Sequence, residues 1–195
     1  MKEDQIIASA VEYIQTLFSR DCSGHDADHT LRVYRNAMVI GDTEPLCDRF
    51  VVALAALLHD ADDHKLFQTE NNANARSFLE KHLISQETIA YICQVINGIS
   101  FSKNRGIRPQ TLEGKIVQDA DRLDAIGAIG IARAFAFGGE RKRPISDSVQ
   151  HFYDKLLLLK DEMNTLEGKR MAESRHILMQ TFLETLEREM AITHR

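Results

Sequence analysis

The sequence predicts an all-α fold. Apolar residues recur at intervals of three and four along most of the chain, which is the period of one face of a helix. Runs that alternate apolar and polar residues are few, and the 195 residues include only three prolines and ten glycines, so strands and their turns are scarce. No internal repeat, low-complexity tract or shift of composition divides the chain. We therefore expect a single helical domain over residues 1–195.

Three helices are expected at the start of the chain. The first carries an apolar face over residues 6–18 and should end at the Ser-Gly pair 23–24. The second runs from residue 27 to residue 41 and has a histidine, His29, on its apolar stripe. The third runs from Asp48 through residues 50–58 and stops at His59-Asp60, and it is apolar on all sides, which is typical of a buried central helix.

Five more helices are expected after the third. They cover about 70–83, the stretch from Ser85 to Asn97-Gly98, about 112–137 with an end at Gly138-Gly139, 147–161 and 168–192. The inner residues expected for these helices include Leu83, Phe152, Phe182, Leu178 and Met190.

Composition and charge exclude several classes of protein. A net charge of -5 argues against a general nucleic-acid binder that depends on phosphate attraction. The three cysteines are widely spaced and form no Cys-x-x-Cys pair, so neither a disulfide framework nor a thiolate zinc site is indicated. The acidic start, Met1-Lys2-Glu3-Asp4, lacks the apolar core expected of a signal peptide, and no run approaches 18 apolar residues. We expect a cytoplasmic protein with no membrane segment.

Polar side chains interrupt the apolar helices at three places. His59 and Asp60 follow the most hydrophobic segment of the chain, where a buried carboxylate is costly unless a cation or hydrogen bond compensates it. His29 lies on the second helix, and Asp121 and Asp124 lie one turn apart on the predicted long helix. Two imidazoles with carboxylates suit a divalent ion, and favour Mn, Fe, Co, Ni or Zn over Mg.

Each of these residues also has an ordinary structural interpretation. A histidine on an apolar stripe is more often a hydrogen-bonded core residue than a ligand. A His-Asp pair at a helix end can cap the helix, and Asp121 can pair with Arg122 or Arg133. The order His, His-Asp, Asp, with its members on different predicted helices, favours a metal site.

Three segments carry a resemblance to a known family. They are G-H-D-A-D-H-T-L-R-V at 24–33, A-A-L-L-H-D-A-D-D-H-K at 55–65 and I-V-Q-D-A-D-R-L-D-A-I-G-A-I-G-I-A-R at 116–133, with H-F-Y-D-K-L at 151–156 in addition. In this order they resemble the HD-domain metal-dependent phosphohydrolases, and most closely the small bacterial single-domain branch, some members of which cleave nucleotides. The resemblance implies one HD-domain helical bundle with a buried metal site.

The resemblance also implies roles for particular residues. The family's ligands fall on His29, on His59 and Asp60, and on Asp121, which we prefer to Asp124 because Ala120-Asp121-Arg122-Leu123 is similar to the ligand segment of domains that cleave guanosine tetraphosphate. Related nucleotidases carry an acid that helps to activate water three residues after the aspartate of the His-Asp doublet. Here the doublet is His59-Asp60, and that position is Asp63. A carboxylate placed there can take up the proton of the water, although an exposed loop acid is the alternative.

The expected number of metal ions is one. Two-metal members of the family add histidines between the doublet and the last aspartate, whereas this chain has only His64 and His82 in that interval. A single divalent ion favours hydrolysis over oxygenase chemistry.

Cationic residues near these segments suit a phosphate-bearing substrate. Lys65 follows Asp63 closely, Lys155 lies in the fourth matching segment, and Arg122 and Arg133 stand about three turns apart, so they could share one face of the long helix. Pairing of these arginines with acids is the alternative. Lower-ranked pocket candidates are His25, His151 and Arg175.

The predicted loop between residues 98 and 110 is cationic in an otherwise anionic chain. It holds Lys103, Arg105 and Arg108, and no acid occurs between Glu87 and Glu113. This charge favours an anionic ligand with more than one phosphate, although runs of charge often only face solvent.

We therefore expect a metal-dependent phosphohydrolase that acts on a phosphomonoester or phosphoanhydride of a nucleotide. The alternative is a non-catalytic module that senses a nucleotide through the same metal site, because fold does not fix activity. The expected partner is a small molecule, and the sequence leaves oligomerisation open.

Overall fold

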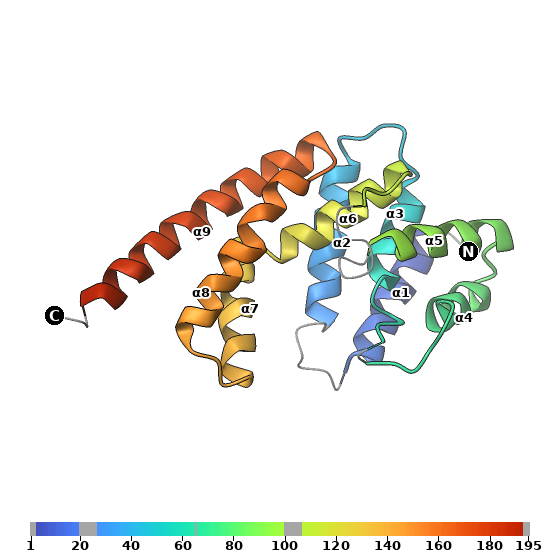
Figure 1. The fold of residues 1–195 in the computed structure, drawn as a ribbon. Coiled ribbons are helices and arrows are strands. Elements are labelled where there is room, and N and C mark those ends of the chain that lie inside the picture. Colours follow the sequence, from blue (N-terminus) through green and yellow to red (C-terminus); the bar gives the residue numbers. More distant parts are fainter. Residues whose placement is uncertain (1–2, 20–26, 65, 100–106, 193–195) are drawn as a thin grey trace. The chain divides into compact units, whose positions relative to one another are not determined.

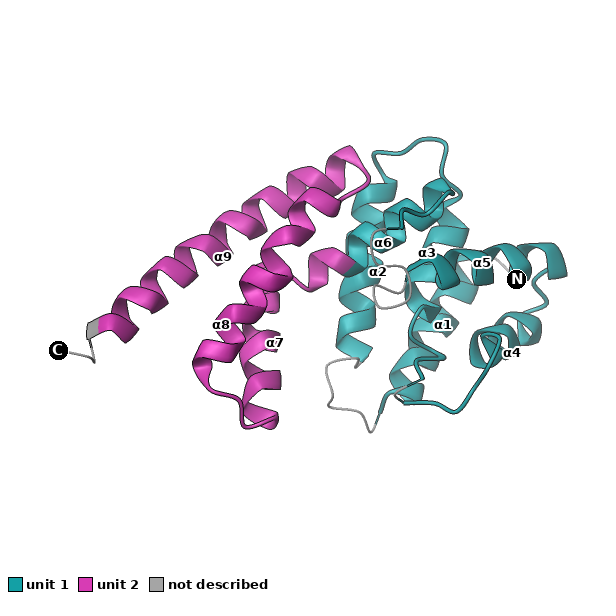
Figure 2. Cartoon of the chain, viewed as in Figure 1, with its two compact units in different colours: residues 1–121 teal, residues 122–195 magenta. Residues whose placement is uncertain are grey.

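A computed structural model describes residues 3–19, 27–64, 66–99 and 107–192 of the chain (Figure 1). Every regular element in these ranges is a helix, so the all-α prediction is confirmed. The chain divides into two compact units, residues 1–121 and residues 122–195 (Figure 2), and each unit is described by itself. The expectation of a single domain stays a prediction. None of the described helices is long and apolar enough to cross a membrane.

The described part of the first unit holds five complete helices and most of a sixth. They are α1 (Glu3–Leu17), α2 (Ala27–Gly41), α3 (Arg49–Leu58), α4 (Ala73–Lys81), α5 (Gln86–Ile99) and α6 (Leu112–Asp124), the last of which continues past residue 121. The predicted bounds of α2 are confirmed. Helix α3 begins one residue after the predicted start, because Asp48 is its N-cap, and His59 is its C-cap. Helix α5 extends one residue beyond the predicted end at Asn97-Gly98, because the next side chain, Ile99, is buried in the core.

Helix α3 is the buried centre of the first unit. All its residues from Val51 to Leu58 are buried, and it packs against α1, α2 and α5. Asp48 caps its start by accepting hydrogen bonds from the backbone N–H groups of Phe50 and Val51 at 3.0 and 3.1 Å. Burial of each leucine contributes about 1.5–3 kcal/mol to stability, so this helix is a rigid base for the residues that follow it.

The start of α6 is fixed to α3 and α5 by one carboxylate. Glu113 accepts a hydrogen bond from the Asp48 N–H at 2.9 Å and another from the Tyr91 hydroxyl at 2.5 Å. Burial and the bond to Glu113 raise the pKa of Tyr91 to about 12. Burial alone would raise the pKa of Glu113, but the hydrogen bonds from Tyr91 and Asp48 outweigh it and lower that pKa. All three residues of this hydrogen-bond network, Asp48, Tyr91 and Glu113, belong to the first unit.

The second unit contains the end of α6 and the elements that follow. They are α7 (Gly127–Glu140), α8 (Ile145–Asp154), a 3-10 helix η1 (Leu156–Glu162) and α9 (Leu166–Ile192). Three aromatic rings join α7, α8 and α9: Phe135 lies 5.9 Å from Phe152 and 5.7 Å from Phe182, measured between ring centroids. Phe152 is fully buried, as predicted, and Phe182 is half-buried.

The prediction of one long helix over 112–137 is wrong, because the helix breaks after Asp124. Gly127 has φ +74°, a conformation that interrupts a helix and that only glycine adopts without strain. Arg175 donates a hydrogen bond to the Leu123 carbonyl at 2.5 Å and so satisfies an acceptor at the end of α6. Arg122 and Arg133 therefore lie on two different helices, and the prediction that they share a helix face is wrong.

The prediction of one continuous helix over 147–161 is also wrong, because this stretch forms two elements. Helix α8 ends at Asp154, Lys155 has φ -143° and ψ -59°, and the chain then forms η1. A residue in that conformation cannot continue an α-helix, so α8 and η1 are two separate elements.

Some predicted inner residues face solvent. Leu178 and Met190 are 45% and 37% exposed, because the buried stripe of α9 runs through Ala172, Met179 and Leu183 instead. Leu83 is 88% exposed, since α4 ends before it and its φ is +58°. Periodicity identified these helices but not the rotation of each helix about its axis.

Candidate metal centre

Four side chains of the first unit converge from three places in the fold. His29 lies in the first turn of α2 and is 2% exposed. His59 is the residue at the end of α3, Asp60 follows it, and Asp121 lies on α6. Asn36 of α2 donates a hydrogen bond at 3.4 Å to the carbonyl of Ala120, the residue before Asp121, so α2 contacts α6 at this point.

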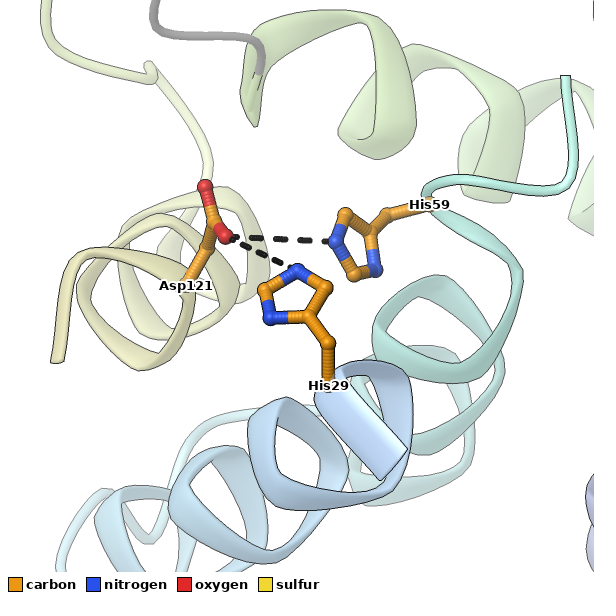
Figure 3. A group of neighbouring side chains, drawn as sticks. All are labelled: His29, His59 and Asp121. Atoms are coloured by element: carbon orange, nitrogen blue, oxygen red, sulfur yellow. Dashed lines mark ion pairs between the residues drawn. The ribbon is translucent and has the colours of Figure 1, made fainter. Parts of the chain in front are cut away.

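The ligand atoms of His29, His59 and Asp121 point at one another (Figure 3). The Nε2 atom of His29 lies 3.4 Å from Asp60 Oδ2 and 3.5 Å from Asp121 Oδ1. The Nε2 atom of His59 lies 3.4 Å from Asp60 Oδ2 and 3.9 Å from Asp121 Oδ1. These separations are longer than strong hydrogen bonds. We call His29, His59, Asp60 and Asp121 the central cluster.

The ring of His59 is held so that one nitrogen faces the central cluster. Its Nδ1 lies 2.8 Å from the Ala56 carbonyl, which can only accept, so Nδ1 carries the proton in the neutral ring. Nε2 then has a lone pair, and it is buried with no hydrogen-bond partner among the described residues. A buried polar atom without a partner is rare in folded proteins and indicates a water or an ion.

The donor set of the central cluster fits a divalent metal ion. Two imidazole nitrogens and two carboxylate oxygens are all acceptors when the histidines are neutral, so they repel one another unless a cation lies between them. Imidazole with carboxylate suits the transition metals more than Mg. His29, His59 and Asp121 alone place one ligand atom each within 4.8 Å of the others, so this group could hold a metal.

Of the two candidate aspartates on the predicted long helix, Asp121 joins the two histidines. Asp124 is 1% exposed and forms an ion pair with Arg133 at 2.7 Å inside the second unit. Its carboxylate therefore has a partner of its own.

The two acids after the doublet have different surroundings. Asp62 accepts hydrogen bonds from the backbone N–H groups of Asn74 and Ala75 at the start of α4. The side chain of Asp63 is 13% exposed and lies 3.6 Å from His64 Nδ1, and the backbone N–H of Asp63 donates to the Asp60 carbonyl at 3.0 Å. The role of Asp63 as a proton acceptor stays a prediction. Lys65, the other predicted catalytic residue, lies outside the described residues.

The predicted substrate-binding arginines both pair with acids of the second unit. Arg122 is buried, and its guanidinium donates to the Glu162 carbonyl at 2.5 Å and lies 3.1 Å from the Glu162 carboxylate. Arg133 pairs with Asp124. The substrate roles of both arginines and of Lys155 stay predictions.

The structure describes only some of the remaining residues that the sequence suggested for phosphate binding. His25, Lys103 and Arg105 lie outside the described residues, whereas Arg108 is described and exposed. The pKa of His151 is lowered by burial and by the positive charges of Lys155 and Arg143. Arg175 is committed to the Leu123 carbonyl.

Sequence reasoning missed the residues that support the central cluster. Glu113 and Tyr91 anchor α6, and Asn74 contacts the segment after α3 by donating a hydrogen bond to the Ala61 carbonyl at 2.7 Å. The sequence carries no signal for these contacts, because each joins residues that are distant along the chain.

The segment that carries the central cluster matches a known protein family. Residues 26–126 match the sequence model described as the HD domain, which is more than half of the chain and includes the whole central cluster. The chain belongs to the HD-domain family.

Relatives of this HD-domain protein cover nearly the whole chain. The YpgQ protein of Bacillus subtilis is 39% identical over 199 residues, which span 97% of this chain and 96% of that protein. The crystal structure of B. subtilis YpgQ in complex with ADP aligns with a TM-score of 0.84 and 35% identity over 97% of both chains. An HD-superfamily hydrolase from Bacillus thuringiensis aligns with a TM-score of 0.81 and 37% identity over 97% of this chain and 99% of that one.

Proposed function

We propose that this protein is a metal-dependent phosphohydrolase that cleaves a phosphoanhydride or phosphomonoester bond of a nucleotide. The observation that carries the proposal is the convergence of His29 Nε2, His59 Nε2, Asp60 Oδ2 and Asp121 Oδ1, with contacts of 3.4–3.9 Å. Similarity to HD-superfamily hydrolases over nearly the whole chain supports the reaction class.

The central cluster would hold one divalent ion, and Mn, Fe, Co, Ni or Zn suits its ligands better than Mg. A bound ion of this kind lowers the pKa of water and stabilises negative charge on phosphoryl oxygens. The Ala56 carbonyl fixes the tautomer of His59 that leaves Nε2 available as a ligand.

Asp63 would take up the proton of the attacking water. Its side chain is mostly enclosed, and it follows the doublet by three residues in a turn that its own N–H closes onto Asp60. A carboxylate beside the reacting water contributes through general base catalysis. Lys65, two residues further along the sequence, would contact a phosphate of the substrate.

A nucleotide is the proposed substrate because YpgQ, which is similar to this chain along its whole length, has been crystallised in complex with ADP. The exposed Arg108 adds positive charge to a chain whose net charge is -5, and this favours a substrate with several phosphates.

The experiment that tests the proposal is a phosphate-release screen. Protein freed of metal and reconstituted with Mn²⁺ is incubated with nucleoside mono-, di- and triphosphates, sugar phosphates and guanosine tetraphosphate, and phosphate and pyrophosphate are both measured. We expect release from a nucleotide by the native protein and none by His59→Ala. The control is His82→Ala, because His82 makes a similar bond from Nδ1 to the Phe78 carbonyl at 2.8 Å but lies outside the central cluster. No release from any compound would contradict the proposal.

A further inference from the structure

The segment that follows α3 is held to the start of α4 by a side-chain amide. Asn74 Nδ2 donates a hydrogen bond to the Ala61 carbonyl at 2.7 Å. Ala61 stands directly after Asp60 and two residues before Asp63, so the bonded carbonyl lies between the two acids. A hydrogen bond at this point restrains the backbone from which both carboxylates project.

A second set of hydrogen bonds runs in the opposite direction. The carboxylate of Asp62 accepts from the backbone N–H of Asn74 at 2.9 Å and from that of Ala75 at 3.1 Å. These are the second and third residues of α4, whose N–H groups a capping side chain ordinarily satisfies. Asn72 occupies the capping position with φ +56° and makes no capping bond of its own. The cap of α4 is therefore supplied by the segment that carries Asp60 and Asp63.

The same segment has little regular structure to hold it. Its backbone makes isolated turn bonds, from the Ala61 N–H to the Leu58 carbonyl at 3.1 Å and from the Asp63 N–H to the Asp60 carbonyl at 3.0 Å. Isolated turns lack the cooperative bonding of a helix, so their backbone angles vary unless other contacts restrain them. A metal site needs its ligands held within about 0.5 Å of their binding positions.

We propose that Asn74 is a positioning residue for the central cluster. The Asn74 side chain bonds the Ala61 carbonyl, and the Asp62 side chain bonds the Asn74 N–H. Together these bonds hold residues 61 and 62 against the start of α4 and so set the directions of Asp60 and Asp63. Tyr13 of α1 supports this arrangement, since its hydroxyl donates to the Asn74 carbonyl at 3.5 Å and its ring lies 5.0 Å from Phe78 of α4. The inference rests on the proposed function, because it requires that Asp60 binds the metal.

The test measures Mn²⁺ affinity of the full chain by electron paramagnetic resonance of unbound Mn²⁺, together with Tm of the metal-free protein. Asn74→Ala removes the bond to Ala61 but keeps the N–H that Asp62 accepts, and alanine is a strong helix former, so α4 stays capped and formed. We expect the affinity to fall about tenfold, the lower end of the loss seen when residues that orient metal ligands are replaced. Asn74→Asp, which turns an acceptor toward the Ala61 carbonyl, should lower it at least as much.

The matched control is Asn72→Gly. It removes a side-chain bond of the same kind, from Asn72 Nδ2 to Asn97 Oδ1 at 3.2 Å, and glycine accepts the positive φ of this position. We expect its Mn²⁺ affinity to match that of the native protein.

The outcomes separate this inference from the proposed function. If His59→Ala binds Mn²⁺ as tightly as the native protein, the proposed metal centre is wrong and the inference falls with it. If His59→Ala loses the ion but Asn74→Ala and Asn74→Asp keep native affinity, only the positioning role is overturned. A lower Tm with unchanged affinity in both Asn74 variants likewise assigns Asn74 to the stability of the fold alone.

Discussion

His29 and Asp121 place Nε2 and Oδ1 3.5 Å apart, although one residue lies at the start of α2 and the other on α6. The contact is made because α3 packs against α2, and because Glu113 ties the start of α6 to α3 and α5. Helix α2 therefore presents His29, and α6 presents Asp121, to the end of α3, where His59 and Asp60 lie.

The first prediction concerns metal content. Purified native protein should contain close to one equivalent of a divalent transition metal, and His59→Ala should contain much less, because it removes a proposed ligand whose buried Nε2 has no hydrogen-bond partner among the described residues. Elemental analysis of both proteins checks this, with His82→Ala as the control. Equal metal in the native protein and in His59→Ala would exclude the central cluster as the binding site.

The second prediction separates a ligand from a base. Asp60→Asn should lose metal, whereas Asp63→Asn should keep it and lower kcat by about 10²–10⁴-fold, the usual contribution of general acid–base catalysis. Metal analysis and steady-state kinetics on the substrate found in the screen check both effects. Full activity in Asp63→Asn would show that another group handles the proton.

The third prediction concerns stability in acid. Because the pKa of Glu113 is lowered in the folded protein, its ionised form stabilises the fold at pH values above the ordinary pKa of 4.5, and that contribution is lost as pH falls through the lowered folded value. Glu113→Gln should lower the free energy of unfolding at pH 7 by about 1–3 kcal/mol, the cost of disturbing a buried hydrogen-bonded acceptor. Urea unfolding at pH 7 and between pH 5 and 3 measures the effect, and the variant should lose less stability on acidification than the native protein.

The third prediction extends to alkaline pH, because Tyr91 belongs to the same hydrogen-bond network as Glu113. The pKa of Tyr91 is raised to about 12, so its neutral hydroxyl stabilises the fold below pH 10 and this contribution is lost as pH rises from 10 toward 12. Tyr91→Phe should remove that part of the alkaline pH dependence. Identical alkaline unfolding curves for Tyr91→Phe and the native protein would contradict the hydrogen bond to Glu113.

The fourth prediction concerns the break between α6 and α7. Gly127→Ala should destabilise the protein by more than about 1 kcal/mol, because the residue has φ +74° and an added Cβ would lie 2.9 Å from the Arg175 Cγ. Gly139→Ala is the control, since no atom beyond its chain neighbours and the backbone of its own helix lies within 4 Å of the added Cβ. Alanine favours a helix, so this variant should be more stable by about 0.5–1 kcal/mol. Thermal unfolding of the two variants compares them directly, and equal shifts in Tm would contradict the strained turn.

The fifth prediction concerns the substrate's phosphates. Arg108→Ala should raise KM for a nucleoside triphosphate more than for the matching monophosphate, because the exposed guanidinium attracts the additional charge. Equal changes in KM for the two substrates would assign Arg108 to the solvated surface.

The sequence by itself determined the helical fold, the position of α2 and α3, and the order of the polar residues that interrupt them. Apolar spacing reports which residues share a face, and this was sufficient to place His29, His59 and Asp60 at buried ends of helices. The motif segments also identified the family, because each motif is a short stretch of consecutive residues that can be recognised without a structure.

Only the tertiary structure decided where the predicted long helix breaks and which of its aspartates joins the histidines. The break lies beside Gly127, whose φ is +74°. Arg175, on a helix distant along the chain, donates to the Leu123 carbonyl at the end of α6, and no local pattern reports that contact. The partners of Asp62, Asp124 and Glu113 are distant in the same way. Hydrogen bonds and ion pairs between remote segments form only after the helices pack, because packing removes water from those groups and selects their partners.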